Sequence, residues 1–354
     1  MHVLIATGGT GGHIFPAIET AKALKVRGHT VTLAGVLGRS EDKIRALGFP
    51  VYSVAAHGFD GRSFQGWLNF GTTMLKAVWR AFDVIRKTSP DKIIGFGGYG
   101  AFPVVMAGIL MRCPTMIHEQ NVVPGRANIL LSKFVKKVAI SFEASRKYFS
   151  RRKSVWTGCP CHHGEGISQS QARLALGLAA DKKTLLLLGG SQGSQKLNEI
   201  FFKWMEASSG VDFQAIHMTG PKDYAFYQER CAQAGLPVVV YAFIDDISQA
   251  YAAADVVIAR AGAATVTELG LLGLAAVLVP YPFAGNHQKY NADVLAATGT
   301  AIVIEQKNLT QDSLQEAVGR LLRGDFSRAS LQMKTKGLLQ TDAPRQLALV
   351  AEGL

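Results

Sequence analysis

The sequence predicts an α/β protein of two domains, each built on a parallel sheet. Three observations support this fold class. Short apolar segments alternate with helical stretches along all 354 residues. The alternation restarts about halfway, after a stretch rich in glycine and proline. The length suits two domains of about 150 to 200 residues better than a single core.

Twelve apolar segments have the character of buried strands. In the first half they are residues 2–6, 30–36, 50–54, 91–96, 114–119 and 136–142. In the second half they are residues 184–190, 213–220, 238–243, 255–261, 275–281 and 301–305. Both halves therefore read as Rossmann-like units.

Residues 154–168 form the expected linker, because glycines and prolines break the periodicity there. We expect a first domain at residues 1–157 and a second at residues 158–335. A C-terminal helix follows at residues 336–354, and the sequence leaves open its return to the first domain. The carboxyl ends of both sheets would line a cleft, where α/β proteins bind ligands.

Charge differs sharply between the halves. Residues 1–157 contain 22 Lys or Arg against 8 Asp or Glu, a balance of +14, whereas residues 158–354 contain 16 against 18, a balance of −2. The basic half indicates an anionic partner, with nucleic acid, an anionic bilayer and a phosphorylated substrate as candidates. A simple asymmetry of solubility is the alternative.

Cysteine content and hydropathy restrict the class of protein further. Four scattered cysteines favour reduced thiols in a cytosolic protein over a disulfide framework or a zinc site. The N-terminus lacks the pattern of a signal peptide. Because no apolar run reaches about 18 residues, we expect any membrane contact to be peripheral.

Three glycine-rich loops follow expected strands, at residues 8–13 (GGTGGH), 97–103 (GGYGAFP) and 189–194 (GGSQGS). Glycine lets the backbone approach an anion, and a following helix offers unpaired N–H groups, so these loops predict phosphate binding. Their spacing fits neither the P-loop nor the dinucleotide fingerprint. Tight turns without a ligand are the alternative reading.

The richest stretch for ligand binding is residues 259–292. Gly262 is expected to turn the chain into a helix, where the Glu268 carboxylate could accept both hydroxyls of a ribose. Amide side chains suited to a sugar follow at Asn286, Gln288 and Asn291. Upstream, the backbone of FIDD (residues 243–246) could pair with a base, while its acids cap the next helix.

These motifs together resemble the MurG family of bacterial glycosyltransferases. The resemblance covers the whole chain and rests on GGTGGH, GGYGAFP, HEQN (residues 118–121), GGSQG, FIDD, GAATVTE (residues 262–268) and HQ followed by NA. It implies the two-domain GT-B fold, and transfer of N-acetylglucosamine from UDP-GlcNAc to lipid I (undecaprenyl-pyrophosphoryl-MurNAc-peptide), which makes lipid II.

The resemblance also implies substrate contacts. The first domain supplies Thr10, Gly11, Gly12 and Asn121. In the second domain, Ser191 would contact the diphosphate and the Ile244 backbone would pair with uracil. Glu268 would bind the ribose and Gln288 the transferred sugar. The phosphate and base pocket would be lined by Ala263, Ala264, Thr265, Val266 and Thr267. His162 replaces an arginine usual in the family, which makes it a doubtful ligand because histidine lacks a permanent charge. Lys196 or Arg260 could substitute.

His13 is the candidate catalytic base. Glu119 is the rival base, and His13 could instead position the sugar and phosphate or cap the helix behind it. We expect no cofactor and no protein-bound metal, because the sequence lacks a metal motif. The partners expected are UDP-GlcNAc, lipid I and an anionic inner-leaflet surface, with cell-wall synthesis proteins as further candidates and no nucleic acid.

The resemblance places the chain peripherally on the cytoplasmic face of the bacterial cell membrane. Residues 67–87 and 129–137 mix apolar and basic side chains and could lie on an anionic bilayer, with a helix facing the core as the alternative for the first. In residues 67–87 the helical spacing involves Leu68, Leu75, Val78, Phe82 and Ile85. Rival functions are a GT-B transferase with another acceptor, a nucleotide-sugar epimerase and a sugar-nucleotide sensor.

Overall fold

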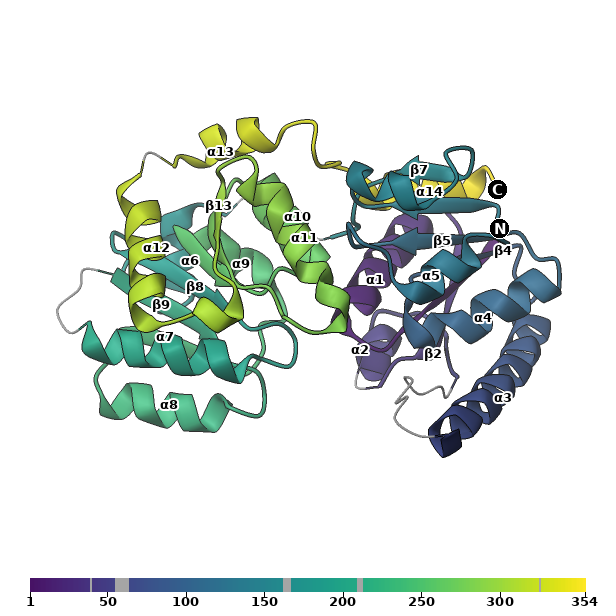
Figure 1. Ribbon diagram of the computed structural model, residues 1–354, viewed down its shortest axis with the longest axis horizontal. Coiled ribbons are helices and arrows are strands. Elements are labelled where there is room, and N and C mark those ends of the chain that lie inside the picture. The colour runs from purple at the N-terminus through teal and green to yellow at the C-terminus, as the bar shows by residue number, and fades with distance from the viewer. Residues whose placement is uncertain (39, 55–63, 162–166, 209–212, 325) are drawn as a thin grey trace. The chain divides into compact units, whose positions relative to one another are not determined.

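The structure, a computed structural model, describes residues 1–38, 40–54, 64–161, 167–208, 213–324 and 326–354. It divides into two compact units. The first comprises Met1–Cys161 and Gln340–Leu354, and the second comprises His162–Leu339. Each is built on a parallel sheet (Figure 1), so the predicted fold class is confirmed.

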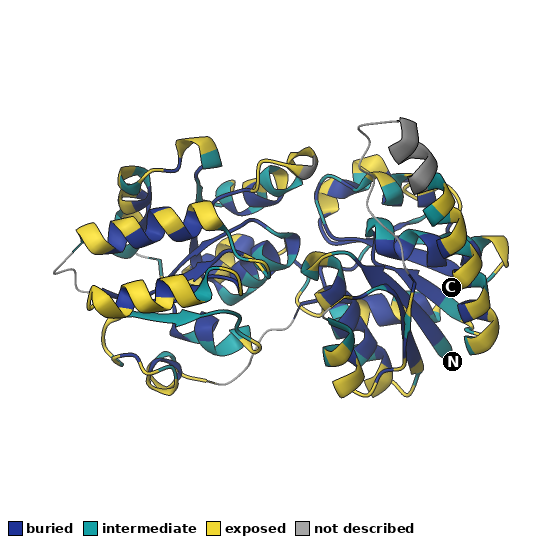
Figure 2. Ribbon diagram, turned by 90° about the horizontal axis from the view of Figure 1, so that it is seen from below, coloured by how far each residue is buried: buried dark blue, intermediate teal, exposed yellow. Residues whose placement is uncertain are grey.

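The first unit has a sheet of seven strands in the order β3-β2-β1-β4-β5-β6-β7. Every pairing in it is parallel. Its strands are β1 (His2–Gly8), β2 (Thr30–Val36), β3 (Val51–Ser53), β4 (Lys92–Gly95), β5 (Thr115–Glu119), β6 (Lys137–Ile140) and β7 (Ser154–Trp156). The central strands are buried on both faces, which explains their uninterrupted apolar sequences (Figure 2).

Helices cover both faces of this sheet. One core contains α1 (Gly11–Val26), Ile44 of α2 (Ser40–Ala46) and the C-terminal helix α14 (Ala343–Glu352). The other contains α3 (Phe64–Thr88), α4 (Gly98–Leu110) and α5 (Arg126–Leu131). The C-terminal helix thus belongs to the first unit, where the Glu352 carboxylate accepts bonds of 2.6 and 2.7 Å from Arg27.

The second unit has six parallel strands in the order β10-β9-β8-β11-β12-β13. They are β8 (Lys183–Leu188), β9 (Phe213–Met218), β10 (Val238–Tyr241), β11 (Val256–Ala259), β12 (Ala275–Leu278) and β13 (Ala301–Val303). Its helices are α6 (Gln169–Ala175), α7 (Gln195–Ala207), α8 (Tyr224–Gln233), α9 (Ile247–Ala253), α10 (Ala263–Leu272), α11 (His287–Ala296), α12 (Gln311–Arg323) and α13 (Arg328–Thr335).

All twelve expected strands are present, and β7 is the one that sequence reasoning missed. It has only three residues and follows a basic turn, so it offers too short a run for a periodicity to appear. The linker expectation was therefore wrong for residues 154–156. The chain passes between units at Cys161 and again at Leu339, four residues after each expected boundary (157 and 335).

Each sheet has a point where the strand order reverses, between β1 and β4 in the first and between β8 and β11 in the second. Loops at the carboxyl ends of strands on either side of such a point form the usual ligand site of a parallel sheet. GGTGGH follows β1 and GGYGAFP follows β4, whereas GGSQGS follows β8 and the GAATVTE segment follows β11. The glycine motifs thus lie at the expected edge of each sheet.

Candidate active site

The GGTGGH loop connects β1 to α1. Thr10 is the exposed N-cap residue, Gly11 and Gly12 are the first two residues of α1, and His13 is the third. The first N–H groups of a helix have no partner within it, and they carry the positive end of its dipole. This geometry suits an anion or a sugar oxygen. Substrate binding by Thr10, Gly11 and Gly12 stays a prediction.

Two glycine loops pack closely around His13. A Cβ atom on Gly98, whose φ is +73°, would lie only 3.0 Å from Cδ2 of the His13 ring. One on Gly100 would lie 3.1 Å from the Gly8 Cα, and one on Gly9 would lie 3.1 Å from the Tyr99 ring. These glycines are therefore required for the close contact between the loops.

The HEQN segment crosses the end of β5, and its alternating side chains point to opposite faces. His118 and Gln120 bond to each other and lie on the side of His13. Nδ1 of His13 is 3.0 Å from Oε1 of Gln120. The imidazole of His13 is thereby tied to the end of β5, although 107 residues separate the two in sequence.

Glu119, the rival base, is a buried anchor for the loop behind it. Its Oε1 accepts bonds from the backbone N–H and the amide of Asn121, at 2.9 and 3.2 Å. Its Oε2 accepts from the Gly125 N–H at 3.1 Å and the Asn128 amide at 2.8 Å. Only 1% of Glu119 is exposed, so this geometry favours a structural role, and its part as the rival base stays a prediction.

The GGSQGS loop of the second unit connects β8 to α7, with Ser194 as the N-cap residue. Ser191 lies in this loop and is partly exposed. Asn198, one turn into α7, is fully buried; its amide donates to the Thr219 carbonyl at 2.9 Å and to Asp223 at 3.0 Å. The Oδ1 atom of Asn198 lies 3.0 Å from Nε2 of His217, so this loop is braced by a buried polar network.

Helix α10 carries the predicted phosphate and base pocket from Ala263 to Thr267, and Glu268. Glu268 is the sixth residue of α10, near the first turn of the helix, as expected. Its Oε2 accepts a 2.8 Å bond from the hydroxyl of Tyr251 on α9. Thr267 bonds back to the Ala263 carbonyl at 2.9 Å, so its hydroxyl serves the helix itself.

The remaining predicted donor residues also lie at this edge of the sheet. Ile244 is partly exposed between β10 and α9, and Asp246 caps α9 through a 3.0 Å bond from the Ser248 N–H, as expected. Gln288, on α11, accepts a 2.9 Å bond from the Tyr281 N–H. Ser191, Glu268 and Gln288 thus follow three adjacent strands, β8, β11 and β12.

Three cations are candidates for the diphosphate. Lys196 is an exposed residue in the first turn of α7, and its contact with the diphosphate stays a prediction. His162 lies outside the described residues. Arg260 is largely buried, and its guanidinium donates to Ser194, the Val279 and Pro280 carbonyls and Gln306 at 2.5 to 3.3 Å. Arg260 therefore ties three loops together at the sheet edge, a structural role that the sequence did not indicate.

In the part of the chain that the structure describes, no group of three or more His, Cys, Asp and Glu side chains is arranged to hold a metal ion. No helix among the same residues is long and apolar enough to cross a membrane.

Sequence comparison matches both units to one family. Residues 3–140 match the N-terminal domain of glycosyltransferase family 28, and residues 184–345 match its C-terminal domain. Each match includes the loops described above for its unit. The chain is thus a glycosyltransferase.

Relatives extend the match to the whole chain. The UDP-N-acetylglucosamine–N-acetylmuramyl-(pentapeptide) pyrophosphoryl-undecaprenol N-acetylglucosamine transferase of Thermodesulfovibrio yellowstonii is 35% identical, over 100% of this chain and 99% of its own. The Bacillus subtilis enzyme of the same name is also 35% identical, with the same coverage. The crystal structure of Acinetobacter baumannii MurG superposes with a TM-score of 0.75 at 29% identity, covering 100% and 99% of the two chains. This chain belongs to the MurG family of N-acetylglucosaminyltransferases.

Proposed function

We propose that this chain transfers N-acetylglucosamine from UDP-GlcNAc to the muramyl 4-hydroxyl of lipid I, which makes lipid II. The observation that carries this proposal is the 35% identity over the full length of relatives whose name states that donor and that lipid-linked acceptor. A match to the donor half alone would leave the acceptor open. Here the acceptor-half motifs GGTGGH, GGYGAFP and HEQN lie within the matched length as well.

The second unit holds the donor. Glu268 accepts the ribose hydroxyls through its carboxylate, the backbone near Ile244 pairs with uracil, and Gln288 bonds the sugar. The hydrogen bond from Tyr251 supports the proposed role of Glu268, because it fixes one carboxylate oxygen and restricts the rotamers of the side chain. Ser191 and the N–H groups at the start of α7 face the diphosphate, where a helix dipole contributes about 0.3 to 2 kcal/mol.

The first unit supplies the base. The muramyl hydroxyl oxygen attacks the anomeric carbon, its proton passes to Nε2 of His13, and the bond from that carbon to the diphosphate breaks. UDP leaves with the electron pair, and the configuration inverts. Positioned bases typically contribute about 10² to 10⁴ in rate. The reaction as proposed needs no cofactor or protein-bound metal, and an irreversible loss of turnover in EDTA would contradict that part.

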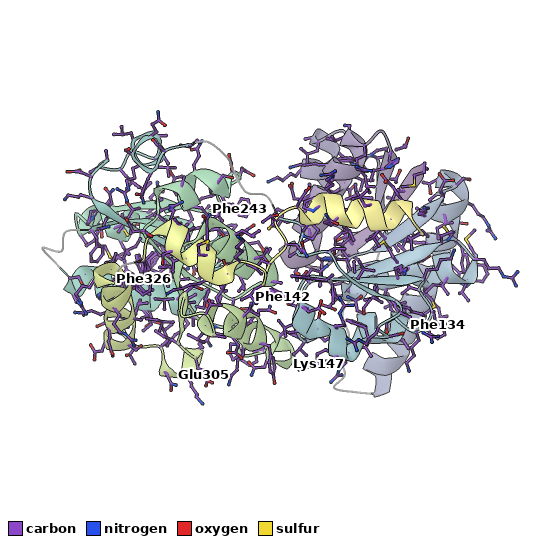
Figure 3. All side chains as sticks on the ribbon, turned by 90° about the horizontal axis from the view of Figure 1, so that it is seen from above. Phe134, Phe142, Lys147, Phe243, Glu305 and Phe326 are labelled. Atoms are coloured by element: carbon purple, nitrogen blue, oxygen red, sulfur yellow. The ribbon has the colours of Figure 1, made fainter. Side chains whose placement is uncertain are left out.

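An exposed apolar surface on the first unit supports peripheral membrane binding. Helices α3, α4 and α5 pack over the same face of the sheet. Their outer sides, with the turn after α5, expose Leu75, Trp79, Leu110, Leu130 and Phe134. Of these side chains, Phe134 is labelled in Figure 3. Exposed basic side chains accompany them at Lys76, Arg80, Arg112, Lys133 and Lys136. Apolar insertion combined with attraction to anionic headgroups gives stable peripheral binding.

The apolar residues expected at helical spacing in residues 67–87 are divided between the core and this surface. Ile85 is buried, Val78 and Phe82 are partly buried against the core, and only Leu75 of the residues we expected is well exposed. The side chain of Leu68 lies outside those described. The structure adds Trp79, which is 67% exposed, to the candidates for membrane contact.

Charge reversal tests the membrane part of the proposal. Replacing Lys133, Lys136 and Lys137 together by Glu should weaken sedimentation with anionic phospholipid vesicles. A matched control in the second unit, Lys182, Lys222 and Lys334 to Glu, makes the same change of charge at exposed positions. Equal loss in both variants would indicate a general effect of net charge and contradict a membrane surface on the first unit.

A transfer assay tests the reaction. The protein is mixed with a panel of labelled UDP-sugars, with and without lipid I in detergent. Label should enter the lipid fraction only from UDP-GlcNAc and only with lipid I present. Transfer to a different acceptor would favour another GT-B transferase, release of an epimerised sugar would favour an epimerase, and binding without turnover on every acceptor would favour a sensor.

A further inference from the structure

A chain of hydrogen bonds connects His13 to the interior of the first unit. Gln120 stands at its centre. Its Oε1 faces Nδ1 of His13 at 3.0 Å, while its Nε2 lies 2.9 Å from the Phe96 carbonyl and 3.1 Å from Nδ1 of His118. Nε2 of His118 in turn lies 2.9 Å from the Gly158 carbonyl. Gln120 and His118 are both buried, so the protein supplies their partners.

The two carbonyls at the ends of this chain determine where the protons lie. A carbonyl oxygen only accepts. The atom of Gln120 facing Phe96 must therefore be its NH₂ group, which directs its oxygen toward His13. The Gly158 carbonyl likewise requires a proton on Nε2 of His118. With one proton on that ring, Nδ1 of His118 is free to accept the second N–H of Gln120.

The chain has this polarity only if His118 is neutral. Burial lowers the pKa of His118 to about 4. The hydrogen bond to the Gly158 carbonyl opposes this shift without cancelling it, and the nearby His13 adds a smaller lowering contribution. The other polar groups near the network do not reverse it. The Glu119 carboxylate bonds to Asn121, Gly125 and Asn128 on the opposite face, and Ser141 lies 3.4 Å from Nε2 of His118.

We infer that Gln120 is a positioning residue for His13: its amide oxygen holds the proton of the neutral imidazole on Nδ1 and leaves the Nε2 lone pair free to act as the base. This inference rests on the role proposed above for His13. A carboxylate does the equivalent work in the serine-protease triad, where the wrong tautomer is strongly detrimental. An amide orients the ring without a charge, so it sets the tautomer while adding little to the basicity of the ring.

The backbone supports this arrangement from both sides. The Thr7 hydroxyl donates to the His13 carbonyl at 2.9 Å, and the ring of His13 packs against Gly98. Phe96, whose carbonyl receives the Gln120 amide, is fully buried, and its ring lies 5.3 Å from that of His118. The groups that position Gln120 thus belong to a rigid sheet edge, as orientation of a side chain requires.

Nitrogen-15 NMR of the His13 ring tests the inference without any substitution. In the wild-type protein, at a pH where His13 is neutral, the signals should be those of the Nδ1–H tautomer. A predominance of the Nε2–H tautomer would overturn the inference. This readout does not depend on turnover, so it separates failure of the inference from failure of the proposed reaction.

Two substitutions extend the test to kinetics. Gln120→Met removes both hydrogen-bonding groups at nearly constant side-chain length. It should lower kcat about 10- to 100-fold, the range for residues that orient a histidine through its other nitrogen. The KM for UDP-GlcNAc should change less than about twofold. Gln120→Glu keeps the acceptor, so it should restore the Nδ1–H tautomer and part of kcat, while its charge moves the acidic limb of the pH profile upward.

The outcomes distinguish the two proposals. Wild-type kcat and tautomer in Gln120→Met would contradict the positioning role even if His13→Ala is inactive. Full turnover in His13→Ala would instead contradict the proposed base. If either variant at Gln120 fails to fold, the wild-type NMR measurement alone decides the tautomer.

Discussion

The loops that follow β1 and β8 occupy equivalent places in their sheets but use their polar side chains differently. Each loop leaves the strand beside the reversal of strand order, turns on paired glycines and enters a long helix. In the first unit the helix presents His13, which is partly exposed and bonded through one ring nitrogen. In the second it presents Asn198, which is fully buried and bonded through both atoms of its amide.

Exposure makes the difference between these two sites. The Asn198 network gives both atoms of this buried amide a partner, because a buried polar group without one costs about 1–3 kcal/mol. His13 is likewise held by a buried polar network, through the contact of its Nδ1 with Gln120. Its Nε2 takes no part in that contact. Under the proposed function, equivalent topology would give one loop that carries chemistry and one that holds a binding surface in place, and the predictions below test this division.

The largest effect is expected at His13. Replacing it by Ala should lower kcat by about 10² to 10⁴ because the transfer loses its base. His29→Ala is a matched control in the same unit, since that ring bonds to Glu352 at the surface. Steady-state kinetics with UDP-GlcNAc and lipid I measure both variants. A loss of less than about tenfold in His13→Ala would remove His13 from the role of base.

The next effect concerns the donor side. Glu268→Gln should weaken UDP binding by about 10- to 100-fold, because hydrogen bonds to a charged group contribute about 1.5–3 kcal/mol. Calorimetric titration with UDP measures this constant. Glu316→Gln, an exposed carboxylate on α12, removes the same charge from the same unit and should leave it unchanged. Equal losses in the two variants would indicate long-range electrostatics in place of a ribose contact.

A smaller effect is the dependence of stability on pH. Burial lowers the pKa of His118 to about 4 and that of His217 to about 3, from an ordinary value of 6.5. Between those values the unfolded chain binds more protons, so the free energy of unfolding is largest above about pH 6.5 and falls as the pH is lowered. The slope approaches about 1.4 kcal/mol per pH unit for each histidine.

Urea unfolding of wild type and His217→Phe, at several pH values between 7.5 and 5, measures this slope. Other groups titrate in both proteins, so the difference between the two slopes isolates His217. The slope of the free energy of unfolding against pH should be smaller in His217→Phe by the contribution of about one proton, about 1.4 kcal/mol per pH unit, whatever the absolute stability of the variant. Identical slopes would show that His217 is protonated in the folded protein.

The smallest effect expected is at Gly98. Gly98→Ala and Gly177→Ala both place a Cβ at positive φ, +73° and +74°, but only the first meets the His13 ring; at Gly177 nothing lies within 4 Å. Both should lose about 1–2 kcal/mol of stability to backbone strain. Gly98→Ala should also lower kcat, by about tenfold, because the ring is displaced from Gln120. Equal kcat in the two variants would mean that the ring tolerates the contact.

Sequence reasoning predicted the sheets well and the site unevenly. Buried parallel strands such as β1 and β8 are continuous apolar runs, which a single sequence displays. The bond between His13 and Gln120 joins residues 107 apart, so no local pattern reports it. One signal was available: HEQN ends a strand, and the period of two puts His118 and Gln120 on one face and Glu119 on the other. The Tyr251 bond to Glu268 had no such signal.

The dissociation constant of UDP-GlcNAc from His13→Ala tests the division of labour most directly. It is measured without acceptor, so that no turnover occurs. If the first loop carries the chemistry and the second unit holds the donor, the constant should stay within about twofold of wild type while transfer is lost. A constant weakened in proportion to the loss of kcat/KM would place His13 in donor binding and contradict the account.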